Sequence, residues 1–167
     1  MKTNKLIKLI TAALMAALTC VTTIAIPIPT PTGGYINPGD AFVLLSGVIL
    51  GPLYGGLAAG IGSMFADIFV AYPYYWATLI IKALAAVVAA LIFRKVKLNS
   101  RIIIAGICGE IIVTLGYFLF EIFIYGLPSA TAEVPLNIIQ NVAGIVLCSL
   151  LFPLLSKVPQ IKEMMKS

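Results

Sequence analysis

The sequence has no histidine and few charged side chains, and both absences narrow what the protein can be. Charged residues make up 10% of the chain, whereas a soluble domain carries about 25%. Without histidine, the commonest metal ligand and general base is missing. The three cysteines are odd in number and each falls in an apolar run, which favours packing over a disulfide or zinc site. We therefore expect no metal, no cofactor and no enzymatic activity.

Apolar residues are abundant instead. They make up 61% of the chain, and the mean hydropathy is +1.10. A transmembrane helix takes about 20 apolar residues, so this chain holds at most roughly six or seven spans. We predict an all-α integral membrane protein whose residues 1–167 form one bundle of six transmembrane helices. The expected spans are residues 9–26, 41–53, 55–71, 76–93, 102–126 and 135–156.

The basic residues predict the orientation of this bundle. With six spans, both termini and the connections after the second and fourth spans lie on one side, and ten of the eleven basic residues fall there. The positive-inside rule makes that side the cytoplasm, so we expect a multi-pass membrane protein with both termini inside the cell. The bases form short clusters between apolar runs, which argues against a nucleic-acid partner. We expect no cleaved signal peptide, because the first apolar run lacks an A-x-A site.

Residues 27–40, PIPTPTGGYINPGD, form the one long segment that is neither apolar nor basic. Its prolines and glycines exclude a regular helix and favour a rigid, turn-rich loop. The predicted topology places this loop outside the cell, where we expect it to cover a small-molecule site and to flex at Gly33 and Gly34. Asp40, the last residue of the loop, is expected to cap the following helix.

Four ionisable residues lie inside predicted spans, where each costs about 2.5–3.5 kcal/mol on insertion scales and calls for a partner or a function. At about 1.5 Å per residue, Asp67, Lys82 and Glu121 lie roughly 8–9 Å below the outer ends of their helices. Glu110 lies about 24 Å below its outer end by the same rise. We therefore expect the first three to share one depth and Glu110 to lie apart from Lys82.

Two helices carry stripes of polar and small residues on one face. The stripes are Glu110, Thr114, Tyr117 and Glu121, and Asn137, Asn141, Gly144 and Cys148, with Gln140 beside the second. Two interpretations stay open, a ligand site rich in directional hydrogen bonds or a structural ion pair with amides that tie helices together. The segment YPYYW, residues 72–76, is likewise either a stacking surface for a flat ligand or an interfacial aromatic belt.

Four segments together match a known family. They are GGYINPGD (33–40), GVILGPLYGGLAAGIGSMFADI (47–68), GEIIVTLGYFLFE (109–121) and PLNIIQN (135–141). With them, the chain resembles the substrate-binding S component of energy-coupling factor (ECF) vitamin transporters over essentially its full length. The resemblance implies a high-affinity substrate-binding subunit without ATPase activity. Its partners would be a transmembrane coupling subunit and two ATP-binding-cassette ATPases, and its location a bacterial plasma membrane.

The resemblance also implies which residues bind the substrate and which contact the coupling subunit. The substrate would lie near the outer surface, against Tyr35, Asn37, Tyr72, Tyr74, Trp76, Lys82, Tyr117, Glu121, Asn137, Gln140 and Asn141. An alanine repeat in the first helix resembles the Ala-x-x-x-Ala surface on which S components dock the coupling subunit. It comprises Ala12, Ala13, Ala16 and Ala17. Packing within the protein would use such small residues equally well.

The substrate and two competing functions stay open. A small heteroaromatic such as a pyridoxine vitamer would suit aromatic stacking together with Lys82, Glu121 and the amides. A stand-alone secondary transporter or channel would use Asp67, Lys82 and Glu110 as a proton or ion path. A purely structural membrane subunit would use the polar stripes only as helix contacts.

Overall fold

The computed structural model describes residues 5–30 and 33–165 and shows a helical bundle with one small hairpin. Residues 31 and 32 of the predicted lid, and the terminal Lys2 and Lys166, lie outside the described residues. The helices are α1 (Lys5–Ala25), α2 (Asp40–Leu50), α3 (Pro52–Phe69), α4 (Tyr75–Lys95), α5 (Arg101–Tyr125), α6 (Leu127–Leu155) and α7 (Pro159–Met164). The antiparallel hairpin pairs β1 (Ile28–Pro29) with β2 (Tyr35–Ile36).

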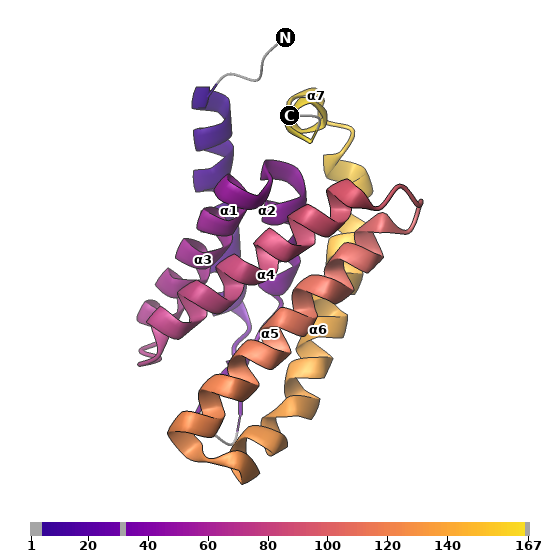
Figure 1. Cartoon of the computed structure of the whole chain (residues 1–167). Coiled ribbons are helices and arrows are strands. Elements are labelled where there is room, and N and C mark those ends of the chain that lie inside the picture. The colour runs from indigo at the N-terminus through magenta and orange to yellow at the C-terminus, as the bar shows by residue number, and fades with distance from the viewer. Residues whose placement is uncertain (1–4, 31–32, 166–167) are drawn as a thin grey trace.

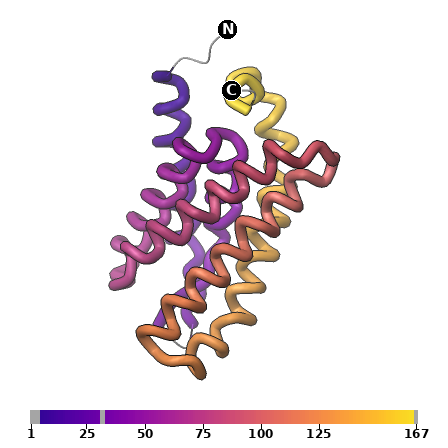
Figure 2. The backbone as a smooth tube through the Cα atoms, viewed as in Figure 1, coloured from indigo at the N-terminus to yellow at the C-terminus, as the bar shows by residue number. Residues whose placement is uncertain are grey.

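The two ends of the bundle differ in which connections they carry. Both chain ends lie at one end, together with the α2–α3 and α4–α5 connections, and we call this the terminal end (Figure 1). The hairpin and the α3–α4 and α5–α6 connections lie at the opposite end, the hairpin end (Figure 2). The short helix α2 lies among the others and contacts α1, α3, α4, α5 and α6. The basic α4–α5 connection thus lies at the same end as the start of α1 and the short α7.

Within the described residues, four helices are long and apolar enough to cross a membrane, namely α1, α4, α5 and α6. The helix α2 is apolar but has only 11 residues. The helix α3 has 18 residues, but with its glycines and the buried Asp67 it is not among the helices apolar enough to cross a membrane. The described residues thus form a helical bundle with several membrane-spanning helices.

Small residues let the helices of this bundle approach closely. A Cβ atom on Gly47 of α2 would lie 2.1 Å from the carbonyl oxygen of Ala86 on α4. A Cβ on Gly62 of α3 would lie 2.4 Å from the carbonyl oxygen of Ala16 on α1. Because these neighbours are backbone atoms that a side chain cannot displace cheaply, glycine is required for the observed packing.

The ends of two helices are set by glycine and proline. Gly51 and Gly126 have φ angles of 86° and 83°, a region that favours glycine, and each separates two consecutive helices. Proline lies in the first turn of the helix that follows each glycine, where its missing N–H costs little. The helix α6 therefore begins at Leu127, well before the predicted span at residue 135, and contains Pro135 in its interior.

The terminal half of the bundle holds the main hydrophobic core. Leu44, Leu45 and Ile49 of α2 are fully buried there and pack with Phe93 of α4. Met164 of the short α7 is also buried in this cluster, so the C-terminal helix closes the core. The cysteines Cys20, Cys108 and Cys148 are all free thiols.

Candidate functional site

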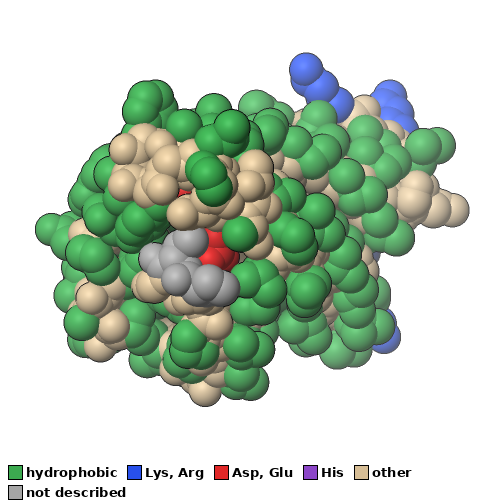
Figure 3. Space-filling model, turned by 90° about the horizontal axis from the view of Figure 1, so that it is seen from below, with side chains coloured by type: hydrophobic (Ala, Val, Ile, Leu, Met, Phe, Trp, Pro, Cys, Tyr) green, Lys and Arg blue, Asp and Glu red, His purple; other side chains and the backbone are tan. Residues whose placement is uncertain are grey.

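A small polar cavity of about 40 Å³ lies beneath the hairpin, between α1 and α3 to α6. Eight of the eleven residues expected to bind substrate line it, namely Tyr35, Asn37, Tyr72, Lys82, Tyr117, Glu121, Asn137 and Gln140. The lining also includes polar residues that were not among the expected binding residues. They are Thr23, Thr30, Ser63, Asp67, Thr78 and Glu133. Figure 3 looks at this end and shows acidic side chains in a hollow, with lysine or arginine only at the far edge.

Three of the expected residues lie outside this lining. Tyr74 packs edge-on against Tyr72 and Phe120, with ring centroids 5.6 and 5.1 Å apart. Trp76 packs edge-on against Phe120 as well, with ring centroids 5.4 Å apart, and remains 50% exposed on the outside of the bundle. Asn141 lies deeper, where its amide nitrogen donates to the Glu110 carbonyl at 3.0 Å and to the Thr114 hydroxyl at 2.6 Å.

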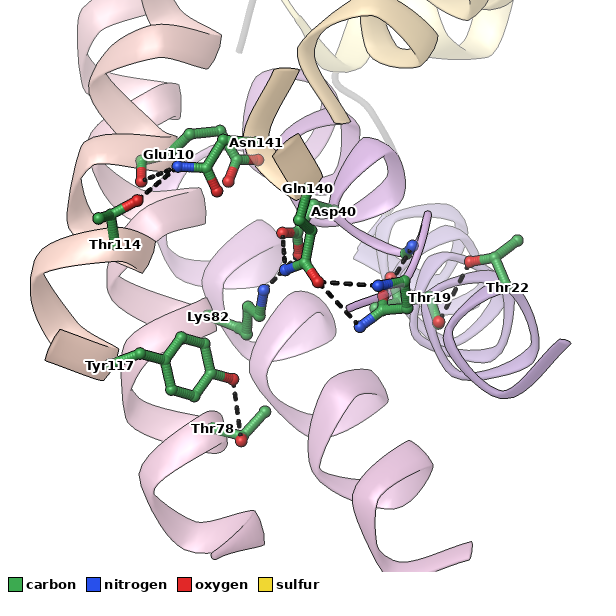
Figure 4. Close-up of polar contacts among 12 residues, drawn as sticks. Thr19, Thr22, Asp40, Thr78, Lys82, Glu110, Thr114, Tyr117, Gln140 and Asn141 are labelled. Atoms are coloured by element: carbon green, nitrogen blue, oxygen red, sulfur yellow. Dashed lines mark hydrogen bonds and ion pairs between the residues drawn. The ribbon is translucent and has the colours of Figure 1, made fainter. Parts of the chain in front are cut away.

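Lys82 of α4, which lines the cavity, forms a buried ion pair with Asp40 at the start of α2. Their side chains are 4% and 1% exposed, respectively. The other oxygen of Asp40 accepts a hydrogen bond from the Gln140 amide at 2.6 Å (Figure 4). The prediction that Asp40 caps α2 was wrong, because the cap position is Gly39 and no side-chain cap bond forms. A buried ammonium needs a carboxylate partner, and Asp40 supplies it.

Gln140 joins this ion pair to the loop before α2. Its side-chain oxygen accepts a hydrogen bond from the backbone N–H of Asn37 at 2.8 Å. The Asn37 side chain in turn accepts from the N–H of Gly39 at 2.9 Å. One chain of hydrogen bonds therefore runs from the residue after β2 through α6 to the Asp40–Lys82 pair.

Tyr35 forms a second link between the hairpin and the helices. Its hydroxyl donates to Asp67 of α3 at 2.5 Å, and its ring contacts that of Tyr72 edge-on at 6.0 Å. Burial, reinforced by the Asp67 carboxylate, raises the pKa of Tyr35 well above its usual range. Burial likewise raises the pKa of Tyr72 above its usual range. Both hydroxyls therefore stay protonated and able to donate at physiological pH.

Several buried oxygens of the cavity lining have no hydrogen-bond partner among the described residues. They are Oδ2 of Asp67, Oε2 of Glu121 and the hydroxyl oxygen of Thr30. Buried polar atoms are rarely left unpaired, and leaving one so costs about 1–3 kcal/mol. The site thus presents acceptors for a ligand's N–H or O–H groups. Within residues 5–30 and 33–165, no cluster of three or more His, Cys, Asp or Glu side chains could hold a metal ion.

The fold places the protein in a known structural class. A solved structure of the S component of a bacterial ECF transporter matches with a TM-score of 0.70. The match covers 92% of this chain and 98% of that chain, at 22% sequence identity. The hairpin, the short α2 and the surrounding long helices therefore form an S-component fold.

The family follows from the sequence match. The family model described as the S component of an ECF-type riboflavin transporter matches residues 3–157, so the chain belongs to that family. It is therefore a multi-pass membrane protein and the substrate-binding subunit of an ECF transporter. The family is a class of transport components and not a class of enzymes. This confirms the resemblance drawn from the four sequence segments.

A relative in Pyrococcus woesei matches a large part of the chain. It is 38% identical over 130 residues, which cover 76% of this chain and 86% of the relative. Its description, "Uncharacterized protein in gap 3'region", names no activity.

Proposed function

We propose that this subunit captures a flat heteroaromatic vitamin in the cavity beneath the hairpin for ATP-driven uptake. The observation that carries the proposal is the combination of unpaired buried acceptors with aromatic rings and a buried ammonium around one cavity. Asp67 and Glu121 would accept from N–H or O–H groups of the vitamin. Lys82 and Gln140 would donate to its carbonyl oxygens, and Tyr35 and Tyr72 would cover its ring system.

Riboflavin is the vitamin that we propose first, with a pyridoxine vitamer as the alternative. The family description names riboflavin, and its flat ring with carbonyls and a hydroxylated side chain suits this mixture of donors and acceptors. Pyridoxine offers fewer polar groups but is smaller. Ligand sites usually enclose about 300–1,000 Å³, whereas the cavity has about 40 Å³. Either vitamin would therefore have to move the hairpin, which supports its role as a lid.

The identity of the ligand is tested on protein purified without added vitamin. Mass spectrometry of the extracted ligand should recover the vitamin, and titration of ligand-free protein should give a nanomolar to micromolar Kd. Glu121→Ala should weaken binding by about 10- to 100-fold, because a hydrogen bond to a charged group contributes about 1.5–3 kcal/mol. Leu119→Ala, on the exposed side of the same helix, is the matched control.

Three results would contradict this proposal. Recovery of no vitamin, with no binding of riboflavin or pyridoxine, would remove the vitamin assignment. Uptake by the protein alone in liposomes, driven by an ion gradient without ATP, would instead favour the stand-alone transporter. An unchanged Kd in Glu121→Ala would move the site away from this cavity.

We also propose that the chain crosses the membrane six times with both termini in the cytoplasm. The basic clusters at the terminal end and the polar hairpin end support this topology. In a cysteine-free background, Thr131→Cys at the hairpin end should react with a membrane-impermeant thiol reagent in intact cells. Ser100→Cys at the terminal end should react only after permeabilisation. The reverse labelling pattern would show that the termini lie outside the cell.

The coupling subunit, we propose, docks on the alanines of α1, and two ATPases complete the complex. Ala13 and Ala17 are exposed on α1, whereas Ala12 and Ala16 pack against the core. Ala13→Trp should therefore abolish co-purification with the coupling subunit while vitamin binding persists. Leu91→Trp, exposed on α4, is the control and should leave the complex intact. Normal assembly of Ala13→Trp would place the docking surface elsewhere.

A further inference from the structure

Glu110 of α5 is buried inside the bundle without a hydrogen-bond donor. Its side chain is 1% exposed, and neither carboxyl oxygen has a partner among the described residues. Asn141 lies beside it, and the amide oxygen of Asn141 is also buried and unpaired (Figure 4). The Asn141 amide nitrogen does not donate to the Glu110 carboxyl group, because it donates to the backbone carbonyl of Glu110 and to the Thr114 hydroxyl. The protein interior around Glu110 thus contains hydrogen-bond acceptors that have no donor.

The charges around Glu110 do not balance if every acid is ionised. Asp40 on α2 and Lys82 on α4 act on Glu110 electrostatically, and Glu110 in turn acts on the Cys148 thiol on α6. Lys82 is the one cation of this group, and its ion pair is with Asp40. Two carboxylates and one ammonium would leave a net negative charge inside the membrane, which is costly. Adjacent like charges add to that cost.

Packing around the two acids favours a proton over a hydrated cation as the missing positive charge. A Cβ atom on Gly144 of α6 would lie 2.9 Å from the Asp40 Cβ and 3.2 Å from Glu110 Oε1. Both acids therefore press against the same glycine from different helices. The cavity beneath the hairpin is lined by other residues and includes neither acid. A proton needs no additional space, whereas a cation needs several oxygen ligands around it.

We propose that Glu110 and Asp40 form a proton-binding pair, in which one proton stays on Glu110 at neutral pH and is shared with Asp40. The proton comes from solvent, and no other bond forms or breaks. With Glu110 neutral, the group of Asp40, Glu110 and Lys82 carries no net charge. Loss of the proton would make the Glu110 carboxylate repel the Asp40 carboxylate. This repulsion would weaken the hydrogen bonds of Asp40 to Lys82 and Gln140. The pair would thus couple pH to the hydrogen bonds that hold the loop, independently of which vitamin is bound.

Infrared spectroscopy of the full chain, reconstituted without vitamin at pH 7, tests the proposal. Wild type should show the C=O stretch of a protonated carboxyl group, sensitive to exchange into D2O, that is lost in Glu110→Gln. Glutamine has the shape of the neutral acid, so this variant should fold normally. Glu121→Gln, which neutralises a buried acid of the cavity lining, is the matched control and should keep the Glu110 band. Identical wild-type and Glu110→Gln spectra would overturn the proposal, as would failure of Glu110→Gln to fold.

Thermal unfolding between pH 7 and pH 9.5 gives a second readout. The folded state holds a proton that the unfolded chain has released, so stability falls as pH rises and Glu110 ionises. The Tm of wild type should therefore drop relative to that of Glu110→Gln as pH increases. Parallel curves for the two proteins would contradict the proposal. A wild-type Tm that rises specifically with sodium, without a protonated carboxyl band, would assign a cation and overturn it.

Discussion

The two halves of the bundle are held together by different kinds of interaction. In the terminal half, fully buried leucine and isoleucine side chains of α2 pack against their neighbours, and glycines bring the helix backbones into contact. In the hairpin half, an ion pair, hydrogen bonds and edge-on aromatic contacts surround a cavity. Apolar packing needs no partner from outside, whereas directional bonds can be exchanged for bonds to a ligand. The terminal half is thus suited to rigidity and the hairpin half to binding.

The helix α2 belongs to both halves. It begins with Asp40 in the polar network and ends at Leu50 in the hydrophobic core. Although it is short, every residue from Val43 to Leu50 is buried, so a change at either end acts on the whole bundle. Variants along α2 and its contacts can therefore separate the contributions of the two halves.

The largest effect is expected from breaking the ion pair of the hairpin half. Lys82→Met should abolish vitamin binding and lower the free energy of unfolding by about 3–5 kcal/mol, because Asp40 is left as a buried unpaired charge. Thermal unfolding and ligand titration in detergent measure both quantities. The double variant Lys82→Met with Asp40→Asn should recover part of the stability but not the binding. Wild-type stability in the single variant would show that the pair does not hold this half together.

A change of one methyl group in the terminal half should affect stability alone. Gly47→Ala places a Cβ against the Ala86 carbonyl oxygen, and overpacking of this kind costs about 1–3 kcal/mol. The Tm should fall while the Kd of the folded protein stays unchanged. Leu53→Ala, at an exposed position of α3, provides the control and should leave Tm nearly unaltered. A Kd that weakens along with Tm would mean that the two halves are not separable.

Gln140→Leu should weaken binding more than it weakens the fold. It removes the link between the Asn37 backbone and Asp40, and bonds to charged groups contribute about 1.5–3 kcal/mol. We expect about tenfold weaker affinity or more, mainly through faster dissociation, measured by stopped-flow fluorescence. Ile139→Leu, on the exposed face next to it, should dissociate at the wild-type rate. Equal dissociation rates for all three proteins would exclude a role for this link in holding the loop.

The smallest effect is expected from Tyr35→Phe, which removes the hydroxyl bond to Asp67. We expect a loss of about 1 kcal/mol, or several-fold in Kd. Because the pKa of Tyr35 is raised by burial and by Asp67, its hydroxyl remains a donor as pH increases. The ratio of the two Kd values should therefore stay constant from pH 7 to 9. A ratio that approaches one by pH 9 would mean that Tyr35 ionises in this range.

The shared depth of the polar residues could be predicted from the sequence. Helical rise alone placed Asp67, Lys82 and Glu121 at one level, and all three line the cavity. The partner of Lys82 could not be predicted in this way. Asp40 lies 42 residues before Lys82 and directly precedes an apolar run, so a local capping rule applied to it. Its true role depends on how deep α2 starts within the bundle, and that depth is set by tertiary packing.

The aromatic segment shows a different limit of sequence reasoning. Tyr72, Tyr74 and Trp76 are close in sequence, yet only Tyr72 lines the cavity. The helix α4 begins at Tyr75, and from there the helical turn directs Trp76 to the outside of the bundle. The start of α6 was also missed, because Pro128 suggested a loop before residue 135, although proline is accepted in a first helical turn.

The edge-on aromatic contacts provide a built-in optical reporter. Ring contacts run without interruption from Tyr35 on the hairpin through Tyr72, Tyr74 and Phe120 to Trp76. Trp76 is the one tryptophan of the chain, so its emission arises from a single site at the end of this series. A ligand that separates Tyr35 from Tyr72 would disturb the series at its other end. Opening of the hairpin should therefore be visible in the intrinsic fluorescence of the unlabelled protein.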